Sequence, residues 1–282
     1  MRGIVGLQLR NPGLYRSLGQ LLGEMLDQAT RQTGGSYAAD MVLHAYPGAA
    51  GPGQSSVCAA AVDMPAKWAA AVVERQDPSL GSVQGESLGQ TTRFTAQAGP
   101  AALESAVKAA FPEAPIVSCG ATVTAFKGTG GWAQIAEQWQ LSRRQGWQAV
   151  AHATPVSTAH AAHTDSTAGT DGTDSAQSGE ARSPMVAAGT DHCLIHDSSS
   201  TMVGSAGSWL AVVRREGGGG QPMVVAETPD LVALASDYAH LAGLPGIEVA
   251  HVFQPAAQVA YIWDRSSPGA RQRHLTPAEP IA

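Results

Sequence analysis

The chain has 282 residues, of which 44% are hydrophobic and 14% charged, and its formal net charge is −6. This length allows one sizeable hydrophobic core or two small ones. No clustered run of Lys or Arg is present, so the composition argues against a nucleic-acid-binding protein. No stretch of about 18 apolar residues predicts a membrane-spanning helix, and residues 1–9 lack the apolar core and cleavage site of a signal peptide.

Cysteine usage indicates the compartment. The three cysteines, Cys58, Cys119 and Cys193, are too few and too scattered for a disulfide framework. We therefore expect a reducing, cytoplasmic setting.

The first half of the chain alternates helical and extended patterns. Leucine and methionine recur at helical spacing over residues 14–29, after an Asn-Pro-Gly turn signal. The same reasoning predicts further helices over 65–73, 101–111 and 132–145. Extended segments are predicted over 1–9, 37–45, 57–62, 116–126 and 147–153.

The second half begins with a change of composition. Residues 157–184 consist almost entirely of small and polar residues, which cannot bury enough surface to offset their ordering entropy, and they predict a disordered insertion. Order should resume near Met185. Strands are predicted over 192–195, 209–214, 223–227, 231–235, 250–253 and 258–263, with a short helix over 237–242. The fold class is therefore α+β, and residues 265–282 should form a flexible, frayed tail.

Several segments carry a resemblance to a known family. They are 1–6 (MRGIVG), 18–19 (LG), 25–26 (ML), 192–196 (HCLIH), 222–228 (PMVVAET), 235–238 (ASDY) and 241–247 (LAGLPGI). The first is similar to the Met-Cys-Gly-Ile-Val-Gly start of class II, N-terminal-nucleophile (Ntn) glutamine amidotransferases, and 192–196 is similar to the strand that leads into that family's His-Asn-Gly motif. The last three segments resemble the stand-alone amidotransferase subunits of glutamate-synthase-like enzymes such as N-methylglutamate synthase.

This resemblance implies a fold, a reaction and a partner. The fold would be a four-layer αββα Ntn-hydrolase-like sandwich over residues 1–264, interrupted by the 157–184 insertion. In working members the initiator Met is removed, and the exposed Cys attacks the glutamine amide with its own α-amine as the base. The chain itself would hold no cofactor. FMN and an iron–sulfur cluster are expected in the large synthase subunit, its expected partner in a hetero-oligomer.

The nucleophile position departs from the family pattern. Arg2 stands where the family has Cys, directly before Gly3. A guanidinium stays protonated to about pH 12 or beyond and has no nucleophilic electron pair at neutral pH. Its bulk should also prevent removal of Met1, so no α-amine would reach the site.

Other pocket positions depart as well. The family's Gly-His-Thr-Arg segment maps onto 151–154 and loses its carboxylate-binding Arg to Thr154, while the oxyanion-binding His-Asn-Gly motif becomes His196-Asp197-Ser198. Between Ser198 and Trp209 the chain is too short for the helix that usually follows. The resulting degenerate pocket comprises Arg2, Gly3, Arg31, His152, Thr154, His196, Asp197 and Ser198. We therefore expect no glutaminase activity, no catalytic residue and no metal ligand in this pocket.

The expected function is therefore that of a non-hydrolysing subunit with a structural or regulatory role in amino-nitrogen metabolism. Two alternatives to this function remain open. One is a hydrolase that uses Cys193 as nucleophile, or a metal held by Asp191, His192, Cys193 and His196. The pair His160 and His163 lies in the polar insertion and is expected to be solvated. The other alternative is a sensor, in which Arg2 and Arg31 hold the carboxylate of glutamine or glutamate without turnover.

Overall fold

The computed structural model describes residues 3–31, 35–44, 58–62, 69–121, 123–156, 185–188, 192–196, 200–205, 209–214, 223–235, 238–241, 244, 251–253, 259–264 and 270–274. The predicted insertion over 157–184 lies outside these ranges. Within the described residues, no helix is both long and apolar enough to cross a bilayer, and the longest, α1 (Leu18–Arg31), has 14 residues.

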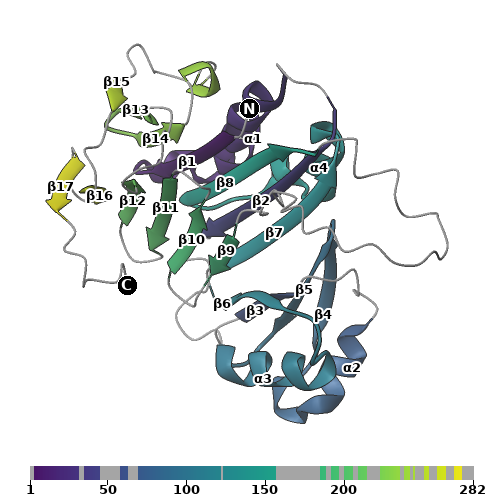
Figure 1. Ribbon diagram of the computed structural model, residues 1–282. Coiled ribbons are helices and arrows are strands. Elements are labelled where there is room, and N and C mark those ends of the chain that lie inside the picture. Colours follow the sequence, from purple (N-terminus) through teal and green to yellow (C-terminus); the bar gives the residue numbers. More distant parts are fainter. Residues whose placement is uncertain are drawn as a thin grey trace, which may run out of the picture.

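A seven-stranded antiparallel sheet forms the centre of the molecule (Figure 1). Its order is β15-β13-β14-β1-β8-β2-β7, and the strand that begins the chain, β1, lies between β8 and β14. The bounds are β1 (Gly3–Leu9), β2 (Tyr37–His44), β7 (Val123–Gly130), β8 (Gln148–Pro155), β13 (Met223–Glu227), β14 (Leu231–Ala235) and β15 (His251–Phe253). The strands predicted over 1–9, 37–45 and 147–153 are confirmed.

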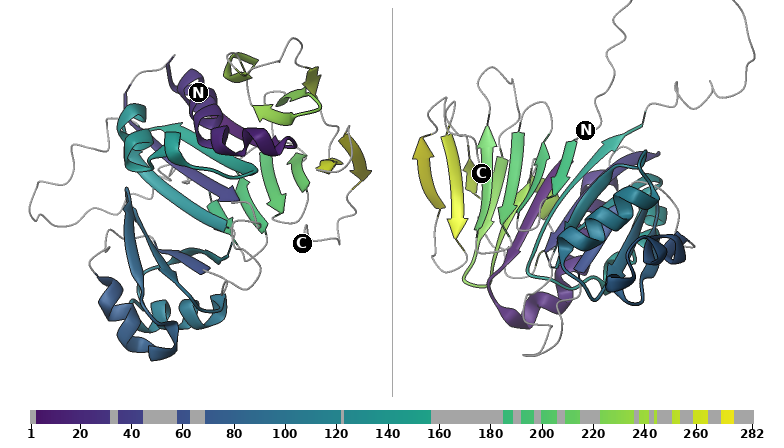
Figure 2. Two further views of the ribbon diagram at one scale, coloured as in Figure 1. Left: turned by 180° about the vertical axis from the view of Figure 1, so that it is seen from behind. Right: turned by 90° about the horizontal axis from the view of Figure 1, so that it is seen from below.

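One face of this sheet is covered by helices. The predicted helix over 14–29 is present as the 3-10 turn η1 (Pro12–Ser17) followed by α1 (Leu18–Arg31), which lies in front of the sheet in the view from behind (Figure 2, left). Beside it lie α4 (Trp132–Gln138), η5 (Leu141–Arg143) and η7 (Tyr238–Leu241). Alternate strand residues, such as Val5, Leu7 and Leu9 of β1, share one buried core with these helices.

A second antiparallel sheet packs on the opposite face. Its order is β17-β16-β12-β11-β10-β9, and β9, β10 and β11 contact β2, β7 and β8 of the first sheet. The bounds are β9 (Met185–Ala188), β10 (His192–His196), β11 (Ser200–Ser205), β12 (Trp209–Arg214), β16 (Val259–Asp264) and β17 (Ala270–His274). Consecutive strands β9 to β12 pair directly with one another, so little chain is left between them for helices.

The described residues therefore form helix, sheet and sheet layers. The prediction of a mixed α and β fold with antiparallel sheets is confirmed. The fourth layer of the expected αββα sandwich is not, because every described helix packs either on the seven-stranded sheet or on a smaller third sheet.

The third sheet belongs to an insert between β2 and β7. Its elements follow one another as strand, helix, strand, strand, helix, strand, and its order is β4-β5-β3-β6 with all neighbours antiparallel. This is the ferredoxin-like split βαββαβ topology, seen in the lower part of Figure 1. The elements are β3 (Cys58–Val62), α2 (Ala70–Gln76), the 3-10 turn η4 (Pro78–Leu80), β4 (Gln84–Leu88), β5 (Thr91–Ala96), α3 (Pro100–Ala110) and β6 (Ile116–Gly120).

The insert has its own core and is tied to the main sheet by polar contacts. Phe94 and Leu103 are among its fully buried side chains. Glu86 of β4 forms an ion pair with Arg144 of the main domain at 3.1 Å. The guanidinium of Arg144 lies over the Phe126 ring, with its carbon 5.1 Å from the ring centroid. The ion pair crosses the junction, and the Phe126 ring supports Arg144 from the side of the main sheet.

Several sequence predictions differ from the structure in detail. The helix predicted over 65–73 is found at Ala70–Gln76, and the extended run over 116–126 is divided between β6 of the insert and β7 of the main sheet. Strands β4, β5, β9 and β11 were not predicted. The tail expected to fray from residue 265 contains β17 (Ala270–His274), which pairs with β16. Pairing at a sheet edge requires only backbone groups, so a polar, charged segment can supply an edge strand.

Candidate functional site

The beginning of β1 meets the end of β8. Gly3 is opposite Ala153 and Ile4 is opposite His152, because the two strands run antiparallel. Thr154 follows Ala153 in β8 and is paired with Ala38 of β2. The structure therefore brings together Gly3, His152 and Thr154, three of the positions that the sequence assigned to one pocket.

The end of helix α1 lies at the same end of the sheet. Arg31 is the last residue of α1, and the carbonyl of Thr30 accepts a hydrogen bond of 2.7 Å from the Tyr37 hydroxyl at the start of β2. The backbone N–H of Val156, just beyond β8, donates to the Ser36 carbonyl at 2.8 Å. The C-terminal end of α1 thus lies near the start of β2, which is opposite the end of β8 that carries Thr154.

The remaining pocket positions are only partly described. Arg2, Asp197 and Ser198 lie outside the described residues. His196 is the last residue of β10, a strand of the second sheet that contacts β8. Their joint assignment to the pocket therefore stays a prediction.

His152 is buried between the sheets and has a polar neighbour. Its side chain is 1% exposed, and the hydroxyl oxygen of Thr154 lies 3.2 Å from each of its ring nitrogens. A threonine hydroxyl is neutral and can donate only one hydrogen bond. It cannot replace the pair of parallel hydrogen bonds that a planar guanidinium forms with a carboxylate.

The sequence analysis missed two charged residues beside His152. The register pairs His152 with Asp40 of β2, and Asp40 with Lys127 of β7. Asp40 is 5% exposed and Lys127 is partly buried. Directly opposed residues have Cβ atoms about 4.5–5.5 Å apart, so the three side chains form one polar row. The sequence does contain a sign of this row, because Asp40 lies within the mostly apolar segment 37–44. A carboxylate that is buried there is expected to have polar partners.

This row faces the second sheet. Ala39, Met41 and Leu43 of β2 share the core with the helices, so by strand alternation Asp40 has the opposite orientation. A second polar row runs parallel to it, with Gln8 opposite Gln148 and Gln148 opposite His44, all three fully buried. Two polar rows therefore cross the face that the first sheet turns toward the second, and buried apolar residues such as Ile4, Val42 and Val150 lie on the same face.

The alternatives that rely on a metal or on Cys193 stay predictions. Among the described residues there is no group of three or more His, Cys, Asp or Glu side chains placed to hold a metal ion. Asp191, His160 and His163 lie outside those residues. The thiol of buried Cys119 donates to the Pro100 carbonyl at 3.3 Å within the insert, which is a structural role.

Comparisons with known proteins give one distant structural similarity to report. No family model matches the chain, and no curated protein matches it. Among solved structures, the chain is similar to glutamine phosphoribosylpyrophosphate amidotransferase from B. subtilis, solved in complex with ADP and GMP. The TM-score is 0.46 and the identity 9%, over 98% of this chain and 49% of that one. The chain thus spans about half the length of that enzyme.

Proposed function

We propose that this chain is a glutamine amidotransferase-like subunit that does not hydrolyse glutamine, and that it acts in a complex of the glutamate synthase or N-methylglutamate synthase type. The observation that carries the proposal is the position of β1. The segment that resembles the family's N-terminal motif enters the centre of the main sheet at Gly3, beside His152 and Thr154. That is the geometry a terminal nucleophile would need, and the sequence places Arg2 there instead of Cys.

The chemistry of the residues argues against amide hydrolysis. Attack on the glutamine amide needs a thiolate and a nearby base, and Arg2 supplies neither because its guanidinium remains protonated. Thr154 offers a single neutral hydrogen bond in place of a bidentate Arg. Asp197 would set a negative charge near a developing oxyanion, which raises the barrier instead of lowering it.

A subunit of this kind would have a structural or regulatory role. The partner would be the large synthase subunit, with FMN and an iron–sulfur cluster in that subunit. Without glutamine hydrolysis, nitrogen would have to enter the complex as free ammonia or as a small amine.

One observation favours a second candidate, ligand binding without turnover. The row of His152, Asp40 and Lys127 combines a carboxylate and an ammonium group between two sheets. An amino acid carries the same two kinds of charge, and to bind there it would have to compete with contacts that Asp40, Lys127 and His152 already make. If glutamine or glutamate binds there, saturation at about 100 times Kd should stabilise the fold by about 2.7 kcal/mol.

Co-expression with a large synthase subunit tests the proposal. We expect the two chains to co-elute in size-exclusion chromatography, and the complex to form product from ammonia or methylamine but not from glutamine labelled with ¹⁵N at its amide. Transfer of the labelled amide nitrogen, or persistence of this chain as a separate monomer in the mixture, would contradict the proposal. Glutamine-dependent thermal stabilisation of the chain alone would instead support the sensing role.

A further inference from the structure

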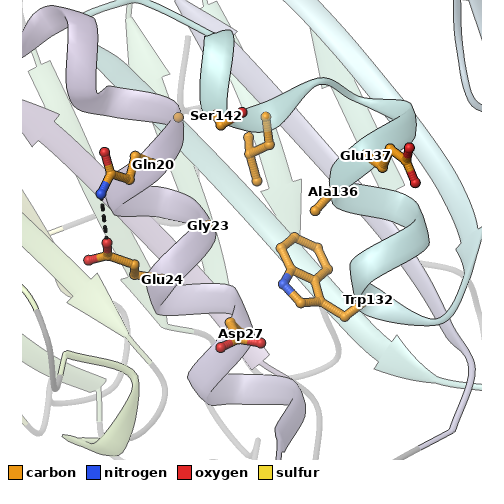
Figure 3. A pocket seen from close by; sticks show the side chains of 10 residues that line it. Gln20, Gly23, Glu24, Asp27, Trp132, Ala136, Glu137 and Ser142 are labelled. Carbon is orange, nitrogen blue, oxygen red and sulfur yellow. Dashed lines mark hydrogen bonds between the residues drawn. The ribbon is translucent and has the colours of Figure 1, made fainter.

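An open groove lies on the outer face of the helix layer, far from the space between the sheets. It runs between α1 and α4, is closed at one end by η5, and has a volume of about 480 Å³ (Figure 3). Trp132 and Ala136 project into it from α4, and Gly23 lies opposite them on α1. Leu141 completes a floor that is mainly apolar.

Glycines on α1 allow this floor to form. A Cβ at Gly19 would lie 1.9 Å from the Leu141 carbonyl oxygen, and one at Gly23 would lie 3.3 Å from Leu141 Cδ2. The absence of both side chains lets η5 approach the helix closely and leaves the surface concave. Trp132 is fixed in turn by an edge contact with Trp139, whose ring centroid is 6.2 Å away.

The rim of the groove is acidic on both sides. Glu24 and Asp27 line it from α1, and Glu137 lines it from α4. Glu24 accepts a hydrogen bond of 3.1 Å from Gln20. None of the described residues that line the groove is basic. Arg144, two residues beyond the lining residue Ser142, is directed elsewhere and binds Glu86.

We propose that this groove docks a basic amphipathic helix of a partner protein. The groove between α1 and α4 can receive apolar side chains of a third helix, which would enter beside Gly23 and Ala136 and cover the remaining exposed edge of Trp132. Lysine or arginine residues flanking those apolar side chains would lie against Glu24, Asp27 and Glu137. Charge complementarity selects this occupant. A second copy of the chain has a net charge of −6, and an anionic membrane surface would be repelled by the same carboxylates.

The test uses a defined probe and the full chain. The probe is a fluorescently labelled 18-residue helical peptide of leucine and lysine, with leucines at positions i, i+3, i+4 and i+7, and binding is measured by anisotropy at about 0.1 M salt. The groove variant carries Glu24→Gln, Asp27→Asn and Glu137→Gln. A matched control removes the same number of charges from the insert, with Glu74→Gln, Glu104→Gln and Glu113→Gln. A peptide of the same composition in scrambled order controls for amphipathicity.

We expect the groove variant to bind the helical peptide at least about tenfold more weakly than wild type, and the control variant to stay within about twofold. Ala136→Trp, which fills the groove without a change of charge, should weaken binding similarly. Circular dichroism establishes that each variant is folded. Equal loss in the groove and control variants, equal binding of the scrambled peptide, or no binding to wild type would overturn the proposal.

Discussion

Two glycines one helical turn apart on α1 should respond in opposite directions to alanine. At Gly19 the new Cβ would lie 1.9 Å from the Leu141 carbonyl oxygen and 2.9 Å from that of Arg144. Both contacts are with backbone, so η5 would have to move by roughly 1 Å, which also weakens the 3.1 Å hydrogen bond from Gly19 N–H to the Arg144 carbonyl. At Gly23 the contact is 3.3 Å, with the end of the Leu141 side chain.

The magnitudes follow from these contacts. Alanine is favoured over glycine within a helix by about 1 kcal/mol, and this gain applies to both positions. For Gly19→Ala the overpacking and the lost hydrogen bond cost more, so we expect a net destabilisation of about 2–4 kcal/mol. Gly23→Ala should be neutral or stabilising by up to about 1 kcal/mol.

Urea unfolding followed by tryptophan fluorescence measures both free energies, and for a chain of this size each kcal/mol corresponds to roughly 2–4 °C in Tm. Equal stabilities for the two variants would refute the close approach of η5 to α1.

Three further predictions concern single contacts. Glu86→Gln removes the ion pair with Arg144 at the junction of the insert and should lower the unfolding free energy by about 1 kcal/mol, an effect that weakens at high salt. Trp139→Ala empties a fully buried position and should cost about 3–5 kcal/mol in chemical denaturation. Hydrogen bonds from Ser79 hold the pKa of Asp77 below its ordinary value. Asp77→Ala should therefore destabilise the protein at neutral pH, and the difference should shrink in denaturation curves recorded below that lowered pKa, because the charge-dependent part of the capping interaction is then lost.

Local patterns predicted the elements with strong apolar periodicity. The helix predicted over 14–29 could be recognised because its apolar residues recur with the helical period of 3.6 residues. The strands at 37–45 and 231–235 could be recognised because each is a short, mostly apolar run. Strand β4 (Gln84–Leu88) was missed because its sequence, QGESL, has only one large apolar residue. Its place in a sheet is set by β5, with which it pairs along its whole length.

Topology required information that no local pattern holds. β1 pairs with β14, which is more than 200 residues away in the chain. The insert was not predicted because its last strand, β6, and the returning strand, β7, lie within one continuous extended run over 116–126. The candidate site was predicted in part. Gly3, His152 and Thr154 do lie together, but the contribution of Asp40 and Lys127 depends on strand register, which the sequence does not specify.

Ammonia release from glutamine by the purified polypeptide is the most direct test of the central claim. Wild-type protein should release no more ammonia than a blank without protein, and Arg2→Cys should remain inactive because Thr154, Asp197 and Ser198 also depart from the pocket pattern. Recovery of activity in Arg2→Cys would show that the substitution at position 2 alone accounts for the loss of glutaminase activity. Release by the wild-type polypeptide, free of contaminating enzymes, would contradict the account.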